Sequence, residues 1–318
     1  MITTTNTIVV ALGGNALAPA GARATVYDQF RHTRESLEAV VKLAAEGWRI
    51  AIVHGNGPQV GDALERNELA RQSVEPLPLG VLVAGTAGWI GYMIQQSLQN
   101  ALRRLDIDRR VLTVITQSVV ASDDPRLSEP SKPIGNVLTE AAAEELRRRG
   151  VAVGSDSLGR LRRLVPSPTP IDIVEAEVVK QLVGEGKIVI AAGGGGPPVY
   201  RGPASGWEGV DAVVDKDRTA AILGNCLGAD TLLVLTNVSA VHRDWGTDAA
   251  TPIPRMTVSE AKAMLATGTL PAGSMAPKLE AAVSFIEGGG RRAVIANLDE
   301  GVSALNGETG TTIVGDTE

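Results

Sequence analysis

The sequence predicts an α/β protein in which a mostly parallel sheet carries helices on both faces. The first observation is that short apolar runs alternate along the chain with longer amphipathic stretches, as in parallel sheets joined by helical crossovers. The second is that several of these runs end directly in glycine. The third is the length, because 318 residues at roughly 150 per domain allow two domains, or one large domain with a subdomain.

The expected strands are short runs rich in Val, Ile and Leu. They are Thr7–Leu12, Trp48–His54, Val111–Thr116, Ile188–Ala192, Thr231–Thr236 and Ala293–Asn297. Tyr27–Glu46 is expected to form one helix, because its apolar residues fall near one face. Pro58–Arg71 is expected to form the next, with proline near the first turn, where a missing N–H does no harm. Arg218–Leu227 is a further helix candidate.

One stretch, Pro76–Leu102, carries no charged residue. A membrane span needs ~20 apolar residues, and glutamines from Gln95 onward interrupt this run before that length. A buried helix or a subunit-interface helix is therefore favoured, with a membrane span as the alternative. Three regularly spaced glycines would let a second backbone approach closely, which suits a helix packed on its symmetry mate. These are Gly85, Gly88 and Gly91.

Two regions depart from the strand–helix alternation. Ser122–Pro170 is rich in Pro, Ser and Arg, and a helix is expected only near Thr139–Arg149. It is predicted to be an inserted subdomain or lid. Pro197–Trp207 has the composition of a loop, and it is expected to join two lobes.

Composition excludes several classes of protein. The net charge of −6 and the nine aromatic residues argue against a nucleic-acid binder, which needs a basic face or a stacking platform. The three histidines lie far apart and do not have zinc-site spacing. Cys226 is the single cysteine, which excludes an internal disulfide and indicates a reducing, cytoplasmic location. It falls in an apolar helical stretch and is expected to be a small buried hydrophobe rather than a nucleophile.

Glycine-rich loops follow three of the expected strands. They are Leu12–Ala16, His54–Pro58 and Ala192–Gly196. A tight strand–helix turn needs glycine in any case, so one such loop has an ordinary structural explanation. Three on one sheet favour phosphate binding, because glycine lets backbone N–H groups approach an anion. The P-loop motif and the nucleophile elbow of α/β-hydrolases do not occur.

The lysines are few, seven against 23 arginines. Four of them are expected to be solvated beside amphipathic segments: Lys42, Lys180, Lys187 and Lys262. Lys132, Lys216 and Lys278 lie in loop-like surroundings. A compact ammonium on a flexible stem suits a phosphoryl group in transfer, while the alternative is that these are ordinary loop lysines. Asp217 has an alternative role as the N-cap of the following helix.

Taken in order along the chain, these motifs resemble the amino acid kinase superfamily and, within it, the carbamate kinase family. The motifs are Val9–Leu17, His54–Gly61, Thr86–Asn100, Lys132–Gly135, Val165–Pro170, the four-glycine run, Asp215–Asp217 and Gly273–Lys278. The resemblance implies a three-layer αβα sandwich and a homodimer. It also implies reversible phosphoryl transfer between ATP and carbamate, giving ADP and carbamoyl phosphate, with Mg²⁺. No nucleic-acid or membrane partner is implied.

The resemblance also assigns the parts of the chain. Residues 1–200 would bind carbamate or carbamoyl phosphate and dimerise, with a protruding subdomain at about 122–170, and residues 201–318 would hold the nucleotide. Lys132 would reach in from the subdomain, Lys216 and Lys278 would stabilise the phosphoryl charge, and Asp217 would orient the lysines. The groups holding the carbamoyl and phosphoryl moieties would be Gly13, Gly14, Asn15, Gly55 and Asn56, with Gly194 and Gly195 of the glycine run as further phosphate-binding residues.

Two segments depart from the family pattern, and both lie in the expected subdomain. Asn136–Leu138 follow Gly135 where the family commonly has proline and aromatics, and Gly159–Arg163 stand where it commonly has Gly-Trp or Gly-Tyr. These changes bear on acceptor choice and lid closure. A relative that phosphorylates another small carboxylate therefore stays open as an alternative. A non-catalytic nucleotide sensor is a second alternative, which the presence of all three lysines disfavours.

Overall fold

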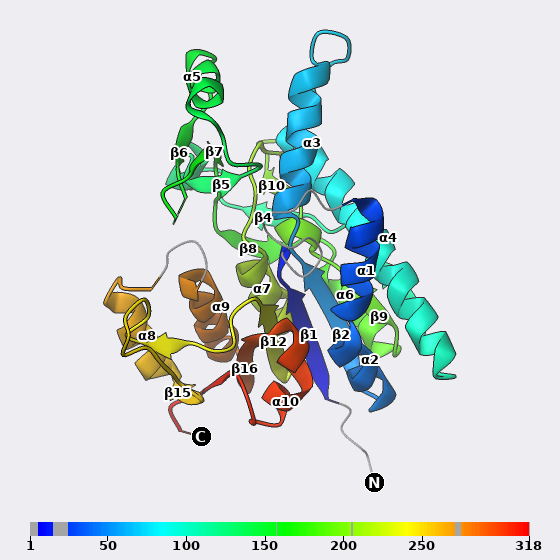
Figure 1. Cartoon of the computed structure of the whole chain (residues 1–318). Helices are drawn as coiled ribbons and strands as arrows, with labels where there is room; N and C mark the ends of the chain where they lie inside the picture. Colours follow the sequence, from blue (N-terminus) through cyan, green and yellow to red (C-terminus); the bar gives the residue numbers. More distant parts are fainter. Residues whose placement is uncertain (1–5, 15–24, 157, 205, 271–274, 318) are drawn as a thin grey trace.

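The computed structural model describes residues 6–14, 25–156, 158–204, 206–270 and 275–317. Its centre is an eight-stranded sheet with the order β15-β17-β16-β12-β1-β2-β9-β3 (Figure 1). The six strands from β16 to β3 run parallel, and β17 pairs antiparallel with β16. The strands are β1 (Thr7–Leu12), β2 (Arg49–His54), β3 (Val111–Thr113), β9 (Ile188–Ile190), β12 (Thr231–Thr236), β15 (Arg255–Thr257), β16 (Arg292–Asn297) and β17 (Thr311–Val314). All six predicted strands form, although β3 and β9 end earlier than expected.

Helices cover both faces of this sheet. Successive side chains of β1 alternate between two cores, as the pleat requires: Ile8, Val10 and Leu12 pack in one, and Val9 and Ala11 in the other. The first core is closed by α2 (Glu38–Ala45), α4 (Leu79–Arg104) and α10 (Gly301–Leu305), with α1 (Val26–Glu35) packed on α4. The second is closed by α6 (Ala176–Gly184), α7 (Lys216–Leu227), α8 (Val258–Ala266) and α9 (Met275–Glu287). The predicted three-layer αβα fold is confirmed.

The single helix expected over Tyr27–Glu46 is wrong. The structure has two helices, α1 and α2, separated at Ser36 and Leu37. Leu37 leaves helical geometry, with φ −95° and ψ 0°, and its side chain is buried in the core. The break falls at a residue of the core, and helical periodicity alone does not report it.

The expected loop at Pro197–Trp207 is also wrong. It contains most of an antiparallel pair, β10 (Pro198–Arg201) and β11 (Trp207–Gly209). With β4 (Ser118–Val120) and β8 (Pro170–Ile173) this pair forms a four-stranded sheet of order β11-β10-β4-β8. Proline is tolerated at the first position of a strand, so the proline that suggested a loop is compatible with β10.

A small sheet stands apart from the main one. It consists of β5 (Lys132–Ile134), β7 (Leu161–Val165) and β6 (Val153–Ser155), in that order, and carries the predicted helix as α5 (Glu140–Arg148) with Thr139 as N-cap. In Figure 1 it projects beyond the main sheet on the same side as the outer end of α3 (Gly57–Ala70). We call residues 122–170 the subdomain. A short pair, β13 (His242–Arg243) and β14 (Thr251–Pro252), completes the strands.

The uncharged segment forms α4, which is 26 residues long. Within the residues that the structure describes, no helix combines the length and apolarity needed to cross a bilayer. The three glycines of α4 have different surroundings. Gly91 packs against Thr113 of the same chain, whereas Gly85 is exposed and Gly88 is half-buried. Close approach of a second backbone is therefore open to Gly85 and Gly88 only.

Candidate active site

A cavity of about 530 Å³ opens at the carboxyl ends of the parallel strands. The loops after β1, β2, β12 and β16 all contribute to its wall. Ligands of open α/β sheets bind at this edge. The residues contributed by these loops include Gly13, Gly14, Gly55, Asn56, Asn237 and Leu298.

Most of the residues singled out from the sequence meet in this cavity. Gly13, Gly14, Gly55, Asn56, Lys132, Gly194, Lys216, Asp217 and Lys278 all line it. Asn15 lies outside the described residues. Gly195 is not among the described lining residues. Its carbonyl accepts hydrogen bonds from the hydroxyls of Ser118, at 2.5 Å, and Thr219, at 3.2 Å, so Gly195 supports the glycine run from behind.

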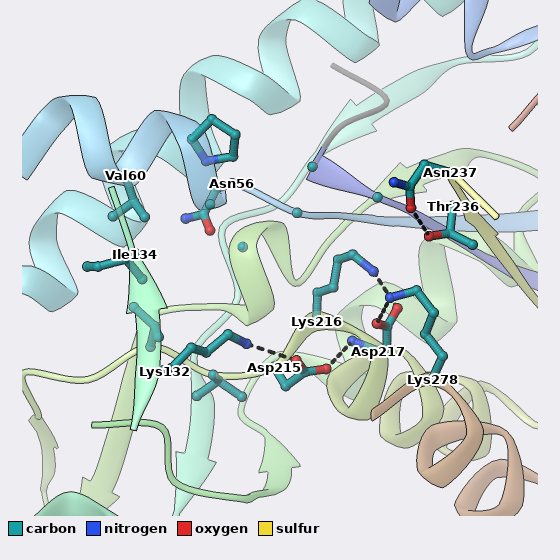
Figure 2. A pocket seen from close by; sticks show the side chains of 18 of the residues that line it. Asn56, Val60, Lys132, Ile134, Asp215, Lys216, Asp217, Thr236, Asn237 and Lys278 are labelled. Atoms are coloured by element: carbon teal, nitrogen blue, oxygen red, sulfur yellow. Dashed lines mark hydrogen bonds and ion pairs between the residues drawn. The ribbon is translucent and has the colours of Figure 1, made fainter. Parts of the chain in front are cut away.

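Asp217 lies between two lysines, as Figure 2 shows. Lys216 Nζ contacts its Oδ1, and Lys278 Nζ lies 3.3 Å from its Oδ2. The Asp217 side chain is only 3% exposed, so both contacts are shielded from water and stronger than surface ion pairs. This is the geometry expected of a carboxylate that orients two ammonium groups toward one space.

Asp215 has the N-cap role that the sequence offered to Asp217. Its Oδ1 accepts a hydrogen bond from the Asp217 N–H at 2.9 Å, and its Oδ2 receives Lys132 Nζ at 2.8 Å. The helix therefore begins at Lys216, two residues earlier than expected. Lys132, Lys216 and Lys278 lie in β5, α7 and α9, so the prediction of loop-like surroundings is wrong for all three. The N-cap preference for Asp was the signal that could have identified Asp215.

Burial and charge shift the pKa values in opposite directions here. Burial lowers the pKa of the Lys216 ammonium, and the Asp217 carboxylate opposes that effect. Burial would raise the pKa of Asp215, but the ammonium groups of Lys132 and Lys216 outweigh it and hold that pKa below its ordinary value. Asp215 is therefore ionised at neutral pH and pairs with Lys132 across the cavity.

The N-terminus of α3 faces the same cavity. The N-cap residue of α3 is Asn56. Among the described contacts its side chain makes no capping hydrogen bond, and its Nδ2 donates instead to Thr86 Oγ1 at 2.9 Å. Gly194 packs directly on it with φ +66°, and a Cβ there would lie 2.2 Å from Asn56 Nδ2. The positive end of a helix attracts anions. The cavity thus places an open helix N-terminus opposite a cluster of lysines, and this arrangement can bind phosphate.

Several lining residues were not identified from the sequence. They are polar residues at or just beyond the ends of β12 and β16: Thr236, Asn237, Asn297 and Asp299. Their position after apolar strands was the available signal. Among the described residues, no group of three or more His, Cys, Asp or Glu gathers in a metal-binding arrangement.

The remaining lysines and the cysteine lie elsewhere. Lys42, Lys180 and Lys262 are exposed, as predicted, whereas Lys187 is half-buried and paired with Glu185. Cys226, on α7, is half-buried rather than fully buried, and burial raises the pKa of its thiol.

Cys226→Ala is expected to retain most activity, because a thiol with a raised pKa is a poor nucleophile and Cys226 is not among the cavity-lining residues. Steady-state kinetics on the purified variant would test this. A loss above ~100-fold, the size expected for a catalytic group, with an unchanged circular dichroism spectrum would contradict it.

The family of the chain follows from comparisons with known proteins. The model of the amino acid kinase family matches residues 6–297. The chain is 42% identical over 310 residues to the carbamate kinase of Pyrococcus horikoshii, covering 96% of this chain and 98% of the relative. It is 45% identical over 308 residues to that of Halobacterium salinarum, covering 96% and 97%. The solved carbamate kinase from Giardia lamblia bound to AMP-PNP superposes with a TM-score of 0.90 at 34% identity, covering 98% and 99% of the two chains. The chain therefore belongs to the amino acid kinase family and, within it, to the carbamate kinases.

Proposed function

We propose that this protein is an ATP-dependent phosphotransferase that moves a phosphoryl group reversibly between ATP and carbamate, giving ADP and carbamoyl phosphate. The observation that carries the proposal is the convergence of Lys132, Lys216 and Lys278 on one cavity that also receives the N-terminus of α3. Phosphoryl transfer asks an enzyme to position two anions and to stabilise the charge on the moving group. These groups can do both.

The two substrates would occupy opposite sides of the cavity. Residues 1–200, with the subdomain, would hold carbamate or carbamoyl phosphate through Gly13, Gly14, Gly55 and Asn56, and residues 201–318 would hold the nucleotide. A second, smaller hollow supports the latter placement, because it adjoins Lys278 and is lined by His242, Trp245 and Met275. The rings of His242 and Trp245 meet edge to face at 5.3 Å and give aromatic surface beside Lys278, on the side of the cavity proposed for the nucleotide.

Mg²⁺ would arrive with the nucleotide. Two of the cavity carboxylates, Asp215 and Asp217, are already paired with lysines. The described residues therefore do not fit a magnesium site built from protein ligands alone. They fit a site in which phosphate oxygens and water hold most of the ion, as is common for Mg²⁺. Bound there, the ion would neutralise charge on the phosphates.

The test is a coupled assay in the ATP-forming direction. ADP and carbamoyl phosphate should yield ATP, while acetyl phosphate in its place should not. Equal use of acetyl phosphate would favour the alternative acceptor, and absence of turnover with bound ADP would favour a nucleotide sensor.

We further propose a cytoplasmic homodimer that pairs through α4. The outer face of this helix carries Val81 and Tyr92, which are 49% and 55% exposed, on either side of Gly85 and Gly88. Such an apolar, glycine-containing face suits a two-fold interface.

Gly88→Leu is expected to produce monomer or aggregate, because the added side chain would force the two helices apart. Light scattering on the purified variant measures this directly. A variant that stays dimeric at the wild-type mass would argue against α4 as the interface.

A further inference from the structure

The subdomain rests on one face of α3. Gly61, Glu65 and Glu68 follow one another at spacings of four and three residues, which places them on the same side of the helix. Each of the three contacts the subdomain. Figure 1 shows α3 and the subdomain projecting beyond the sheet together.

The contact nearest the cavity is made by backbone. A Cβ on Gly61 would lie 2.2 Å from the Cα of Gly135, so only glycine permits this approach. Beside it, side chains of both parts share one buried apolar cluster, to which α3 contributes Val60 and Leu64 and the subdomain contributes Ile134 and Val165.

The contacts farther along α3 are polar. Asn136 Nδ2 donates to Glu65 Oε2 at 2.7 Å. Glu68 Oε1 accepts from Arg163 Nη1 at 3.1 Å, and its Oε2 contacts Arg149 Nη2. The Glu68 side chain is 27% exposed. Burial would raise its pKa, but hydrogen bonds from both guanidinium groups outweigh this and lower it, so Glu68 is charged at neutral pH.

Two of the groups that meet α3 belong to the segments that depart from the family pattern. Asn136 lies in the first segment and Arg163 in the second. Arg163 pairs with Ile134 in the β5–β7 ladder, and Lys132 begins the same short strand, β5. A strand of three residues connects the α3 contacts to Lys132, so a shift of one end moves the other.

We propose that Glu68 is a positioning residue: by binding Arg149 and Arg163 it holds the subdomain on α3 and thereby keeps Lys132 at the cavity. The inference rests on the proposed phosphoryl transfer, because it acts through Lys132. Glu68 lies outside the lining of the cavity among the described residues, so its effect is transmitted through β5 and β7.

Glu68→Gln keeps the shape of the side chain and removes its charge. We expect kcat to fall about tenfold, since displacement of a reacting group by about 1 Å is known to cost up to ~100-fold. The matched control is Glu145→Gln, which removes an exposed ion pair to Arg148 within α5 and should leave kcat unchanged.

The decisive comparison uses a Lys132→Ala background. If Glu68 acts through Lys132, Glu68→Gln should cause no further loss there. An equal loss in both backgrounds, or a Glu68→Gln enzyme as active as Glu145→Gln, overturns the proposal. If Glu68→Gln fails to fold, Arg149→Gln serves instead, because it leaves Glu68 paired with Arg163; unchanged kcat in that variant also overturns it.

A second readout does not depend on turnover. The Lys132 side chain is 32% exposed and paired with Asp215, so it should react slowly with acetic anhydride relative to Lys42, which is exposed, as measured by peptide mass spectrometry. Glu68→Gln should raise the rate of Lys132 labelling relative to the reference lysine severalfold, and Glu145→Gln should not. An unchanged ratio in Glu68→Gln would contradict the positioning role of Glu68. Failure of the proposed function would show separately, as wild-type protein that forms no ATP while the labelling ratio still responds.

Discussion

Replacing Lys216 with alanine is expected to lower kcat for ATP formation by ~10²–10³, the usual cost of removing one preorganised charge from a transition state. The ammonium lies against Asp217 and faces the cavity, where it can stabilise charge on the phosphoryl group during transfer. Steady-state kinetics with saturating ADP and carbamoyl phosphate would measure the loss. The melting temperature should change little, because Asp217 keeps Lys278 as a partner.

Two further variants test whether the loss is specific to the ammonium group of Lys216. Lys216→Arg should also be poor, because a planar guanidinium cannot replace a compact ammonium at close quarters. Lys262→Ala should leave kcat nearly unchanged, because Lys262 lies on an exposed helix and pairs with Glu287 at the surface. Equal activities of Lys216→Ala and Lys262→Ala would show that the Asp-Lys-Asp motif has no role in transfer.

Asp217→Asn is expected to impair both activity and folding. The buried carboxylate contacts the ammonium groups of Lys216 and Lys278, and its neutralisation leaves two like charges together. Breaking a buried ion pair by removing one partner costs about 3 kcal/mol of the free energy of unfolding. The two lysines should then move apart, with a fall in kcat of ~10²–10³. Urea denaturation and kinetics on the same preparation would measure both effects.

The matched control for Asp217→Asn is Glu287→Gln, which neutralises the exposed partner of Lys262. Exposed pairs contribute about 0–1 kcal/mol, so this variant should be close to wild type in urea. If the two variants have the same unfolding midpoint, Asp217 does not hold the lysines in place.

The strands could be predicted well because they are apolar on both faces. β1 and β12 have the bounds expected from the sequence, since a strand buried between two helical layers is a continuous hydrophobic run. The break at Leu37 and the β10–β11 pair could not, because both depend on contacts with distant parts of the chain. Local composition reports a turn or a proline, but it does not report what packs against it.

In the site, too, several residues could be predicted from the sequence, whereas their contacts with distant parts of the chain could not. The lysines and Asp217 were identified from the sequence, but the N-cap role of Asp215 was not. The pairing of Asp215 with Lys132 spans 83 positions, and no local pattern predicts such a contact. The glycine run predicts phosphate binding by both Gly194 and Gly195, whereas in the structure Gly194 lines the cavity and the Gly195 carbonyl accepts a hydrogen bond from Ser118.

The pairing of β1 with β12 at the centre of the sheet fixes a distance within the active site. These strands come from the first and second parts of the chain and are hydrogen-bonded from Ile8–Thr231 to Leu12–Leu235. Their loops, at Gly13 and Asn237, therefore start from neighbouring strands about 4.8 Å apart. In the proposed reaction this spacing fixes the distance between the loop that binds the phosphoryl donor and the loop that binds the acceptor. It cannot widen, because separating β1 from β12 would break the hydrogen bonds between them. Substrate entry and product exit would then require the small β5–β7–β6 sheet to release its contacts with α3, while the main sheet below the cavity stays in place.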